Sequence, residues 1–503
     1  MAKYRTTDVA AGQGIFMQVN FNEQLLPGTF EHMLNELIGN KIDISIFDKK
    51  YKNDATGASA VPPAALLKLA IYGYSKGCLS SRKLSELNEN NIVAKALTGD
   101  MPIHFTTIAD FISGSSEEFS KVFVKALAYC SELGLISGDT YAIDGLRLPS
   151  NASMEMSGTE EQFKERLCLF KKMADKHLAR HQKKDAAGEA GEAEKEHFEE
   201  RQKYLQGQMA KISGFLEGME KKTGRNGEEI KSNITDNESA MIHSSKGYVQ
   251  GYIGIAVSDQ KNQIITSAQA AGTANEGEHL PEMLDRNAEN AKEAGFAPEE
   301  GKKIAMLGDS NYFSGDNLKA CEERGVEAVI PDGQEKKRAG PDGQQRHEAP
   351  DFKYNEQEDC YECPQGKRLE HKGKTKLSKG EREIYQASLT DCKACPDFAR
   401  CSHSKKAQDE ITQGRKILAG KEKGQESILK EMREKQATEE FQALYAKRMQ
   451  IVEPVFANIR YCKGLSRFTL RGKKKVNGQW QLYCMVHNLG KCLNELNARR
   501  NGA

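Results

Sequence analysis

The sequence lacks any run of about 20 apolar residues, the length that a membrane-spanning helix needs. Its first residues, MAKYRTTDVAAGQG, also lack the apolar segment of a signal peptide. Cysteine is sparse, with 12 in 503 residues, which excludes a disulfide scaffold. We therefore expect a cytoplasmic protein with no membrane partner, in which clustered cysteines bind metal.

An excess of one charge is absent too, because 73 basic and 72 acidic residues leave a net charge of +1. The charges are unevenly distributed, however, since residues 441–503 contain 12 Lys and Arg but only 2 Asp and Glu. A basic segment of this kind either contacts nucleic acid or is a solvated tail. The C-terminal region is therefore a candidate nucleic-acid contact.

The length predicts two to four structural units, because one ordinary hydrophobic core does not grow to 503 residues. Residues 21–115 have a helical pattern with several short amphipathic runs. Pro62 and Pro63 suit the start of the helix PPAALLKLAIYGYSKG, and Ser80 and Ser81 suit a cap for RKLSELNEN. Short helices with tight turns favour a helix-turn-helix unit, although many all-helical domains share this layout.

Strands and helices alternate in the middle of the chain. We expect a strand over residues 138–144 that stops at Asp144-Gly145, strands over 248–257, 263–268, 303–307 and 326–330, and helices over 280–294 and 314–324. This alternation predicts an α/β fold, a mixed α+β arrangement whose sheet is at least partly parallel.

A charged helical segment interrupts this pattern over residues 158–232. Its apolar residues follow the spacing of a coiled-coil seam at Phe198, Leu205, Met209, Ile212, Leu216 and Met219. We expect an antiparallel helical hairpin that turns near Gly188 and Gly191. The alternative is a charged, partly disordered linker, which the regular apolar spacing disfavours.

Five cysteines and a histidine gather between Cys360 and His403, in the segments CYEC, CKAC and FARCSH. Paired thiolates two residues apart can reach one ion, and two pairs complete the tetrahedral site that zinc prefers. The cluster therefore predicts a structural zinc site in a small segment with little core of its own. Six candidate ligands compete for four positions.

Three acidic residues are candidate ligands for magnesium. Asp144 and Asp309 each follow a predicted strand, and Glu453 lies beside an apolar helical stripe in YAKRMQIVEPVFANIR. Carboxylates are the ligands that Mg²⁺ prefers, and two such ions can stabilise both oxygens of a phosphodiester displacement. Four basic residues follow Glu453, namely Arg460, Lys463, Arg467 and Arg471.

Each acid also has a purely structural explanation. Asp144 could cap a turn, Asp309 could cap the next helix, and Glu453 could be a first-turn acid beside Pro454. Asp139 is an alternative acid at the end of the first strand.

Several ordered blocks together are similar to the bacterial insertion-sequence transposases of the DDE class, in the branch with a cysteine-bearing insertion. The resemblance covers nearly the whole chain. Its blocks are LLKLAIYGYSKGCLSSRKLSELNEN, HFTTIADF, AIDGLRLPSNAS, GYVQGYIGIAVSD, LGDSNYFSGDNLKACEERGVEAVIP, CPQGKRL, CKACPDFARC and YAKRMQIVEPVFANIR.

The resemblance implies an RNase H-like catalytic core with Asp144, Asp309 and Glu453 as the Mg²⁺ (or Mn²⁺) triad. It implies a helical DNA-binding domain at 1–130, the core at 131–157 and 233–335, the inserted hairpin at 158–232, a zinc-binding insertion at 336–425, and a last part of the core with a basic tail at 426–503. The zinc ligands that it favours are Cys363, Cys392, Cys395 and Cys401, with Cys360 as the spare.

The sequence departs from the family pattern at three places. Leu146 follows Asp-Gly where a small hydroxyl residue is usual, and Ser310-Asn311 replaces the commoner Ala-Gly before Tyr312. The related signature of Tyr, Arg, Glu and Lys falls on Tyr445, Arg448, Glu453 and Arg460, with Arg in place of Lys and one extra residue before the Glu. Arg keeps the charge of Lys but not its geometry.

The function implied is cleavage of DNA at the ends of a mobile element and strand transfer into target DNA. Arg448 and Arg460 are expected to contact phosphates, as is the basic stretch of Lys463, Arg467 and Arg471, and the N-terminal helices to bind the terminal repeats. Paired ends imply a homo-oligomer, with a dimer expected, associated with the bacterial nucleoid. A nuclease without strand transfer and a catalytically silent DNA-binding relic are the alternatives.

Overall fold

A computed structural model describes residues 18–51, 59–187, 192–224, 227–244, 247–299, 301–333, 347–377, 380–401, 412–419 and 426–502. The chain forms two compact units, one of Met1–Phe111 with Leu493–Ala503 and one of Ile112–Cys492. In the described part of the chain, no helix is both long enough and apolar enough to cross a membrane.

The first unit is helical. Its helices are α1 (Phe30–Glu36), α2 (Pro63–Ser75), α3 (Ser81–Asn90), α4 (Ile92–Thr98) and the start of α5 (Phe105–Gly114). Pro63 lies in the first turn of α2, and the Ser80 hydroxyl accepts a hydrogen bond from the Lys83 amide, as the sequence predicts. Gly73 allows α2 and α3 to approach closely, because a β-carbon there would lie 2.0 Å from Leu84 Cδ2.

The second unit contains a six-stranded mixed sheet with the order β4-β5-β1-β7-β8, in which β6 also pairs with β5. The strands are β1 (Thr140–Pro149), β4 (Ala240–Ser244), β5 (Gly247–Asp259), β6 (Ile265–Ala271), β7 (Ile304–Leu307) and β8 (Val326–Val329). The pairs of β5 with β1, β4 and β6 are antiparallel, while β1–β7 and β7–β8 are parallel. The predicted α/β class is confirmed, and the sheet is consistent with an RNase H-like core.

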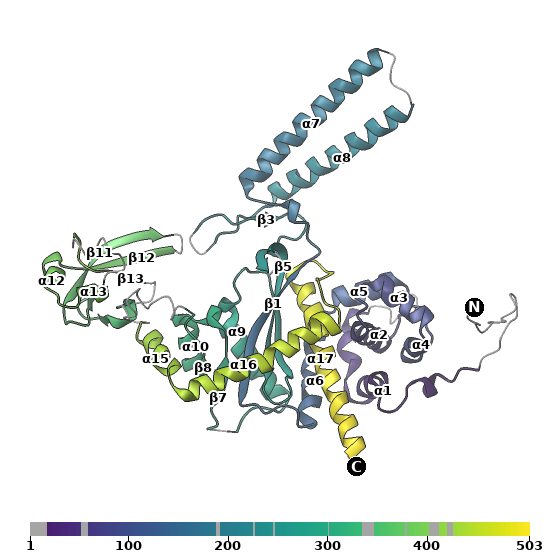
Figure 1. The fold of residues 1–503 in the computed structure, drawn as a ribbon. Coiled ribbons are helices and arrows are strands. Elements are labelled where there is room, and N and C mark those ends of the chain that lie inside the picture. The colour runs from purple at the N-terminus through teal and green to yellow at the C-terminus, as the bar shows by residue number, and fades with distance from the viewer. Residues whose placement is uncertain are drawn as a thin grey trace, which may run out of the picture. The chain divides into compact units, whose positions relative to one another are not determined.

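Helices cover both faces of this sheet (Figure 1). They are α6 (Ser116–Glu132), α9 (Leu280–Glu293), α10 (Gly315–Glu323), α15 (Glu426–Gln436), α16 (Glu439–Ala457) and α17 (Lys473–Gly502). On one face, the fully buried Trp480 of α17 packs over Gly254 of β5 and donates a hydrogen bond to the Ile255 carbonyl (2.9 Å). On the other face, Leu280 and Met283 of α9 belong to the same hydrophobic core as Ile253.

One expectation about chain course is wrong, and one alternative is excluded. The first strand does not stop at Asp144-Gly145, because β1 keeps pairing with β5 from Asp144 to Pro149. The basic C-terminal segment is not a solvated tail, because α17 buries the apolar run between Val476 and Cys492 against the sheet. Net charge alone did not show that its Lys and Arg residues lie mainly at the two ends of that helix.

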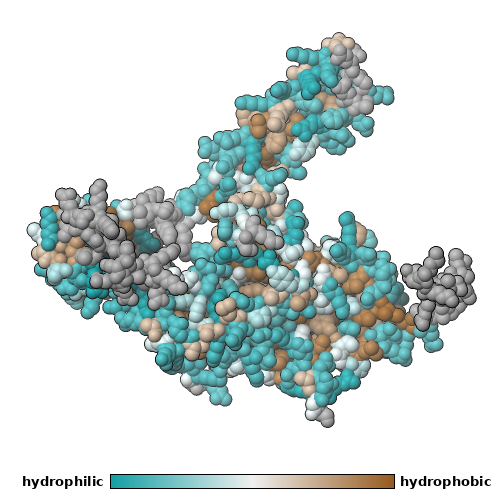
Figure 2. Space-filling model, in the orientation of Figure 1, coloured by the Kyte–Doolittle hydropathy of each residue, from teal (hydrophilic) through white to brown (hydrophobic). Residues whose placement is uncertain are grey.

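Helices α7 (Glu160–Ala186) and α8 (Glu192–Glu217) contact each other along a partly apolar seam. Leu205 and Ile212 are buried, and the rings of Phe163 and Phe215 lie 5.4 Å apart. The visible surface of these helices is largely hydrophilic with small apolar patches (Figure 2). The predicted turn near Gly188 and Gly191 lies outside the described residues. Short strands β2 (Ser157–Gly158) and β3 (Ser232–Asn233) pair beside the hairpin.

The cysteine-bearing segment forms a second sheet with the order β13-β12-β11-β10-β9. Its elements are β9 (Lys353–Asn355), β10 (Cys360–Glu362), β11 (Arg368–Leu377), β12 (Gly380–Ala387), β13 (Lys416–Ala419), α12 (Leu389–Lys393) and α13 (Phe398–Cys401). Contrary to the expectation of little core, Phe352, Tyr361, Leu369 and Tyr385 form a buried cluster here. The composition did not reveal this core, because charged residues alternate with the apolar ones in its short strands.

The close packing of Gly254 on Trp480 generates a test of the core. A β-carbon at Gly254 would lie 2.9 Å from Trp480 Cε2, so we expect Gly254→Ala to destabilise the sheet unit by about 1–3 kcal/mol. Urea unfolding followed by fluorescence measures this directly, because Trp480 is the only tryptophan in the sequence. Gly490→Ala in α17 is the matched control, since its β-carbon would meet nothing within 4 Å, and it should leave the midpoint unchanged or raise it. Equal midpoints for Gly254→Ala and the parent would contradict the packing argument.

Candidate active site

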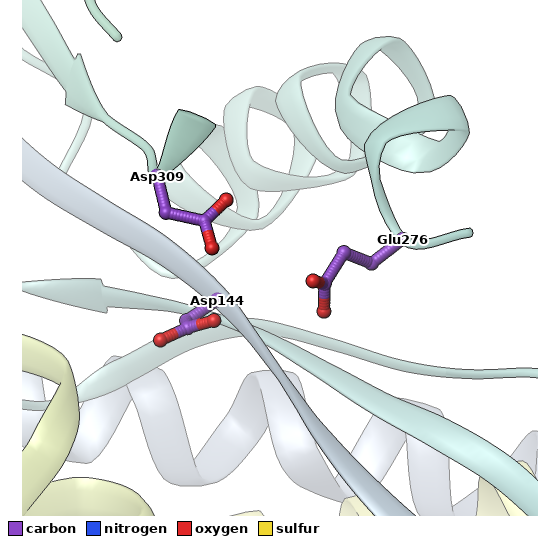
Figure 3. Close-up of side chains that lie close together, drawn as sticks. All are labelled: Asp144, Glu276 and Asp309. Carbon is purple, nitrogen blue, oxygen red and sulfur yellow. The ribbon is translucent and has the colours of Figure 1, made fainter. Parts of the chain in front are cut away.

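Three carboxylates converge at one edge of the mixed sheet. Oxygen atoms of Asp144, Glu276 and Asp309, one from each residue, all lie within 4.8 Å of one another. Figure 3 shows the three side chains pointing toward a common space, Asp144 from β1, Asp309 from the turn after β7 and Glu276 from the loop before α9. Their proximity makes this edge a candidate site for divalent cations.

The short length of β7 opens the space in which these acids meet. β7 pairs with β1 only from Thr140 to Ala142, and the chain then leaves the sheet at Gly308 and Asp309. Beyond Ala142, none of the described strands pairs with that side of β1, so Asp144 lies at an open edge. Functional groups commonly gather where parallel strands end in this way.

Glu276 is the most buried of the three acids, with its side chain 3% exposed. Arg147 donates to its Oε1 (3.0 Å), as does the side-chain amide of Asn311 (3.0 Å). Burial raises its pKa to about 7; Arg147 opposes this, and the charges of Asp144 and Asp309 add to it. The buried carboxyl is therefore easily ionised only when positive charge is close.

Gly145 makes room for Glu276. A β-carbon at this position would lie 2.1 Å from Glu276 Oε2 and 2.6 Å from Ile253 Cγ2. The backbone of Gly145 is regular strand, so the glycine is required by the approach of Glu276 and not by a turn. The structural alternative for Asp144, a cap of a turn at Asp-Gly, does not apply here.

Asp144 lies between an arginine and the other two acids. Nη2 of Arg448 in α16 donates to its Oδ2 (2.7 Å), and the Gly145 amide donates to Oδ1 (2.8 Å). The pKa of Asp144 is nevertheless raised, because its burial outweighs the attraction of Arg448 and because Asp309 is close. Like charges this close favour a bound cation.

Asp309 begins the short helix Ser310–Tyr312, and its Oδ1 accepts a hydrogen bond from the Asn311 amide (2.9 Å). Its structural role as a cap is therefore real, but it does not use up the carboxylate, which still points to Asp144. The Asn311 side chain donates to both Asp309 (3.0 Å) and Glu276 (3.0 Å). The unusual Ser310-Asn311 pair thus supplies an amide that connects two of the acids.

Three polar atoms around the acids are without partners. Within the described part of the chain, Oε2 of Glu276, Oη of Tyr312 and Nε of Arg448 are buried and have no hydrogen-bond partner. Burial together with the charges of Glu276, Asp144 and Asp309 holds the pKa of Tyr312 well above its usual value. Unpaired buried groups cost free energy, so the site is built to receive further atoms.

Glu453 lies outside this group of acids. It is exposed on α16, whereas Phe441 and Val452 of the same helix are buried and Arg448 reaches Asp144. Residues three and four apart share a helix face, which places Val452 and not Glu453 on the face of Arg448. The extra residue between Arg448 and Glu453 therefore rotates the acid away from the face of Arg448.

The sequence analysis did not identify Glu276, because this residue lies in a loop before a helix and not at the end of a predicted strand. One signal was present, namely the glycine at Gly145, which the sequence alone could not distinguish from a turn glycine.

The alternative acid Asp139 precedes β1 and accepts hydrogen bonds from Ser137 (2.8 Å) and Gln260 (2.9 Å). It takes no part in the carboxylate group.

The predicted DNA-contacting residues follow Arg448 along the C-terminal part of α16 and the loop after it. Arg460 lies over the ring of Tyr461 (5.8 Å). Arg467 and Arg471 are tethered at the end of β1, where they donate to the carbonyls of Ser150 (3.0 Å) and Asn151 (2.7 Å). Lys463 is half-buried, so the basic residues form a surface of unequal accessibility.

Four cysteines line one pocket of the second sheet, and they are Cys363, Cys392, Cys395 and Cys401. Backbone amides of Lys367 and Arg415 donate to the sulfurs of Cys363 (3.2 Å) and Cys392 (3.3 Å). Burial and the neighbouring cysteines raise the pKa of Cys401 to about 11. Cys360 instead contacts Glu358 (3.8 Å), and His403 lies outside the described residues.

Two family models match the chain. One described as "Transposase DDE domain" covers residues 362–493, and one described as "Transposase domain (DUF772)" covers residues 19–114. No curated protein and no solved structure matches. The first match includes Arg448, and the second covers most of the helical unit. The chain is therefore a transposase that carries a DDE domain and an N-terminal transposase domain, an enzyme of DNA cleavage and transfer.

Proposed function

We propose that Asp144, Glu276 and Asp309 are the metal-binding acids of this transposase. The observation that carries the proposal is the convergence of their oxygens within 4.8 Å of one another. The donor set fits Mg²⁺ or Mn²⁺, which take carboxylate oxygens, and the unpaired Oε2 of Glu276 offers a free ligand atom. When bound, a pair of such ions stabilises the attacking and leaving oxygens of phosphodiester displacement.

The surrounding residues position these acids and the DNA. Arg147 and Asn311 orient Glu276, while the Gly145 amide and Arg448 orient Asp144. Arg448 holds Asp144 through Nη2 alone, and we assign the rest of its guanidinium, which lies beside the acids, to a phosphate of the bound DNA. Arg460, Lys463, Arg467 and Arg471 extend the positive charge and contact the DNA backbone, with an affinity that falls with salt.

The reaction assigned to this site is hydrolysis at the ends of an insertion sequence, followed by attack of the freed 3′-hydroxyl on target DNA. The N-terminal helical unit binds the terminal repeats, and two ends are held by a homo-oligomer, a dimer in the simplest case. Helices α7 and α8 and the cysteine-bearing sheet are insertions into the catalytic core. These assignments rest on the matched domains and on the order of elements along the chain.

We also propose that Cys363, Cys392, Cys395 and Cys401 bind one structural zinc ion. Four thiols that line one pocket match the number of ligands in a closed zinc site. Amide donors to two sulfurs support thiolate charge, as they do around metal-bound thiolates. The raised pKa of Cys401 means that its thiolate forms readily only beside a cation.

The identity of the third acid is tested by two matched variants. Glu276→Gln should lower magnesium-dependent cleavage and joining of DNA that carries the element's ends by at least about 100-fold, which is about 2.7 kcal/mol of transition-state free energy. Glu453→Gln, the acid that the family resemblance favours, should retain activity within about threefold. Asp309→Asn serves as the inactive reference.

The opposite pattern, with Glu453→Gln inactive and Glu276→Gln active, would assign the third position to Glu453. Cleavage without joined products in the parent protein would indicate a nuclease. DNA binding with no cleavage in any of the proteins would indicate a DNA-binding relic.

The space beside Gly145 generates a second test. Gly145→Ala places a methyl group 2.1 Å from Glu276 Oε2 and should displace this carboxylate, with a loss of cleavage of about tenfold or more and a higher Mg²⁺ requirement. Magnesium titrations of the cleavage rate measure both effects. Gly254→Ala, whose β-carbon would meet Trp480 and not Glu276, controls for general destabilisation. An unchanged magnesium requirement in Gly145→Ala would contradict the role of Glu276.

The zinc proposal predicts one equivalent of zinc in the purified protein by elemental analysis. Cys392→Ser should lose the metal and lower the melting temperature of the protein, because a structural site contributes directly to folding. Cys360→Ser is the matched control, since its sulfur contacts Glu358 outside the pocket, and it should keep the full equivalent. Zinc loss in both variants alike would remove the assignment of the four ligands.

A further inference from the structure

A groove at the end of β1 is lined by side chains that neither the acids nor the zinc site use. Its borders are the end of β1 with the following turn, the start of β5, and the loop after α16. The lining residues that matter are Tyr248, Met154 and Arg467. They bring an aromatic ring, a thioether and a cation together.

The apolar members of this groove face solvent. Tyr248 is 62% exposed and Met154 is 49% exposed. The Tyr248 ring is held from one side by His243 of β4, whose ring meets it edge-on at 5.1 Å. A large ring that is held by one aromatic contact and is otherwise mostly exposed provides a platform for stacking.

Arg467 gives the groove its charge. Its Nη2 donates to the Ser150 carbonyl (3.0 Å), which fixes the exposed guanidinium at the rim. Among the described lining residues no acidic side chain opposes it. A polyanion with flat apolar groups therefore matches the groove better than a neutral or acidic peptide does.

The groove lies further along the strand that carries Asp144, and Tyr248 of β5 lies on the sheet face of Asp144. Asp144 pairs with Ala256 of β5, and every second residue from Ala256 back to Tyr248 shares that face. Pro149, which lines the groove, lies five residues after Asp144, or about 17 Å along the strand. A strand of DNA that passes the acids can therefore reach the groove.

We propose that this groove binds an unpaired stretch of DNA, with one base stacked on Tyr248 and its phosphate at Arg467. In duplex DNA the faces of the bases are covered by their neighbours, so that a protein ring can stack only on an unpaired base. The proposal rests on the proposed function, in which cleavage at an element end brings a separated strand to the acids. It adds to that function the selection of single-stranded over paired DNA at this position.

The test measures binding alone, without magnesium, so that it does not depend on which acids are catalytic. Fluorescence anisotropy of the full chain with a labelled 12-nucleotide oligo-dT is compared with a blunt duplex of the same length. Tyr248→Ala should weaken binding to oligo-dT on the order of tenfold, the range that base stacking supplies, and should change duplex affinity less than twofold. Tyr248→Phe keeps the ring and should bind like the parent.

Two controls separate stacking from other effects. Tyr204→Ala removes a tyrosine of similar exposure (50%) from α8 and should leave both affinities unchanged. The loss in Tyr248→Ala should persist as salt is raised, because stacking releases no counterions, whereas the loss in Arg467→Gln should shrink. An affinity of Tyr248→Ala for oligo-dT within twofold of the parent, or an equal loss for oligo-dT and duplex, would overturn the proposal.

Discussion

The structure depends on bringing three like charges together at the edge of a sheet. Asp144, Glu276 and Asp309 come from a strand, a loop and a turn that are more than 100 residues apart at the extremes, and each repels the others. Arg147 and Arg448 offset that repulsion from two sides. Each arginine pairs with one acid, Arg147 with Glu276 and Arg448 with Asp144, and the metal site that we propose places a small cation in the space that all three share.

This requirement explains several local features that otherwise seem unrelated. β7 is only four residues long, so β1 has an open edge where Asp144 is needed. Gly145 has no side chain because Glu276 occupies the place of its β-carbon, and Gly277 has none because the Asn311 carbonyl lies 2.4 Å from where a β-carbon would be. The two glycines therefore allow the loop before α9 to lie against both β1 and the turn after β7. Sheet pairing alone would not need either of them.

The sequence predicted the strands, the class of fold and two of the clustered acids, because each of these leaves a local pattern. Asp144 and Asp309 are found by asking which acids follow apolar runs near a glycine. Glu276 has no such pattern, since its position depends on how a loop folds back over a strand that precedes it by more than 100 residues. The role of Glu453 stays a prediction: one inserted residue changes only the spacing of a linear motif, but in a helix it turns the following side chain away from the face of Arg448. The buried course of α17 was missed because charge was counted without regard to the apolar run between its charged ends.

Arg448 shows how one side chain can serve both the packing and the chemistry of the site. It is the residue of α16 that reaches Asp144, so it fixes the rotation of that helix on the sheet. The same rotation buries Phe441 and Val452 and leaves Glu453 exposed. A guanidinium has five donors in a rigid fork, so Arg448 can hold Asp144 through Nη2 while its other nitrogens stay beside the acids. A lysine has a single nitrogen and could not pair with Asp144 while keeping further donors beside it, which gives the arginine a physical reason at this position.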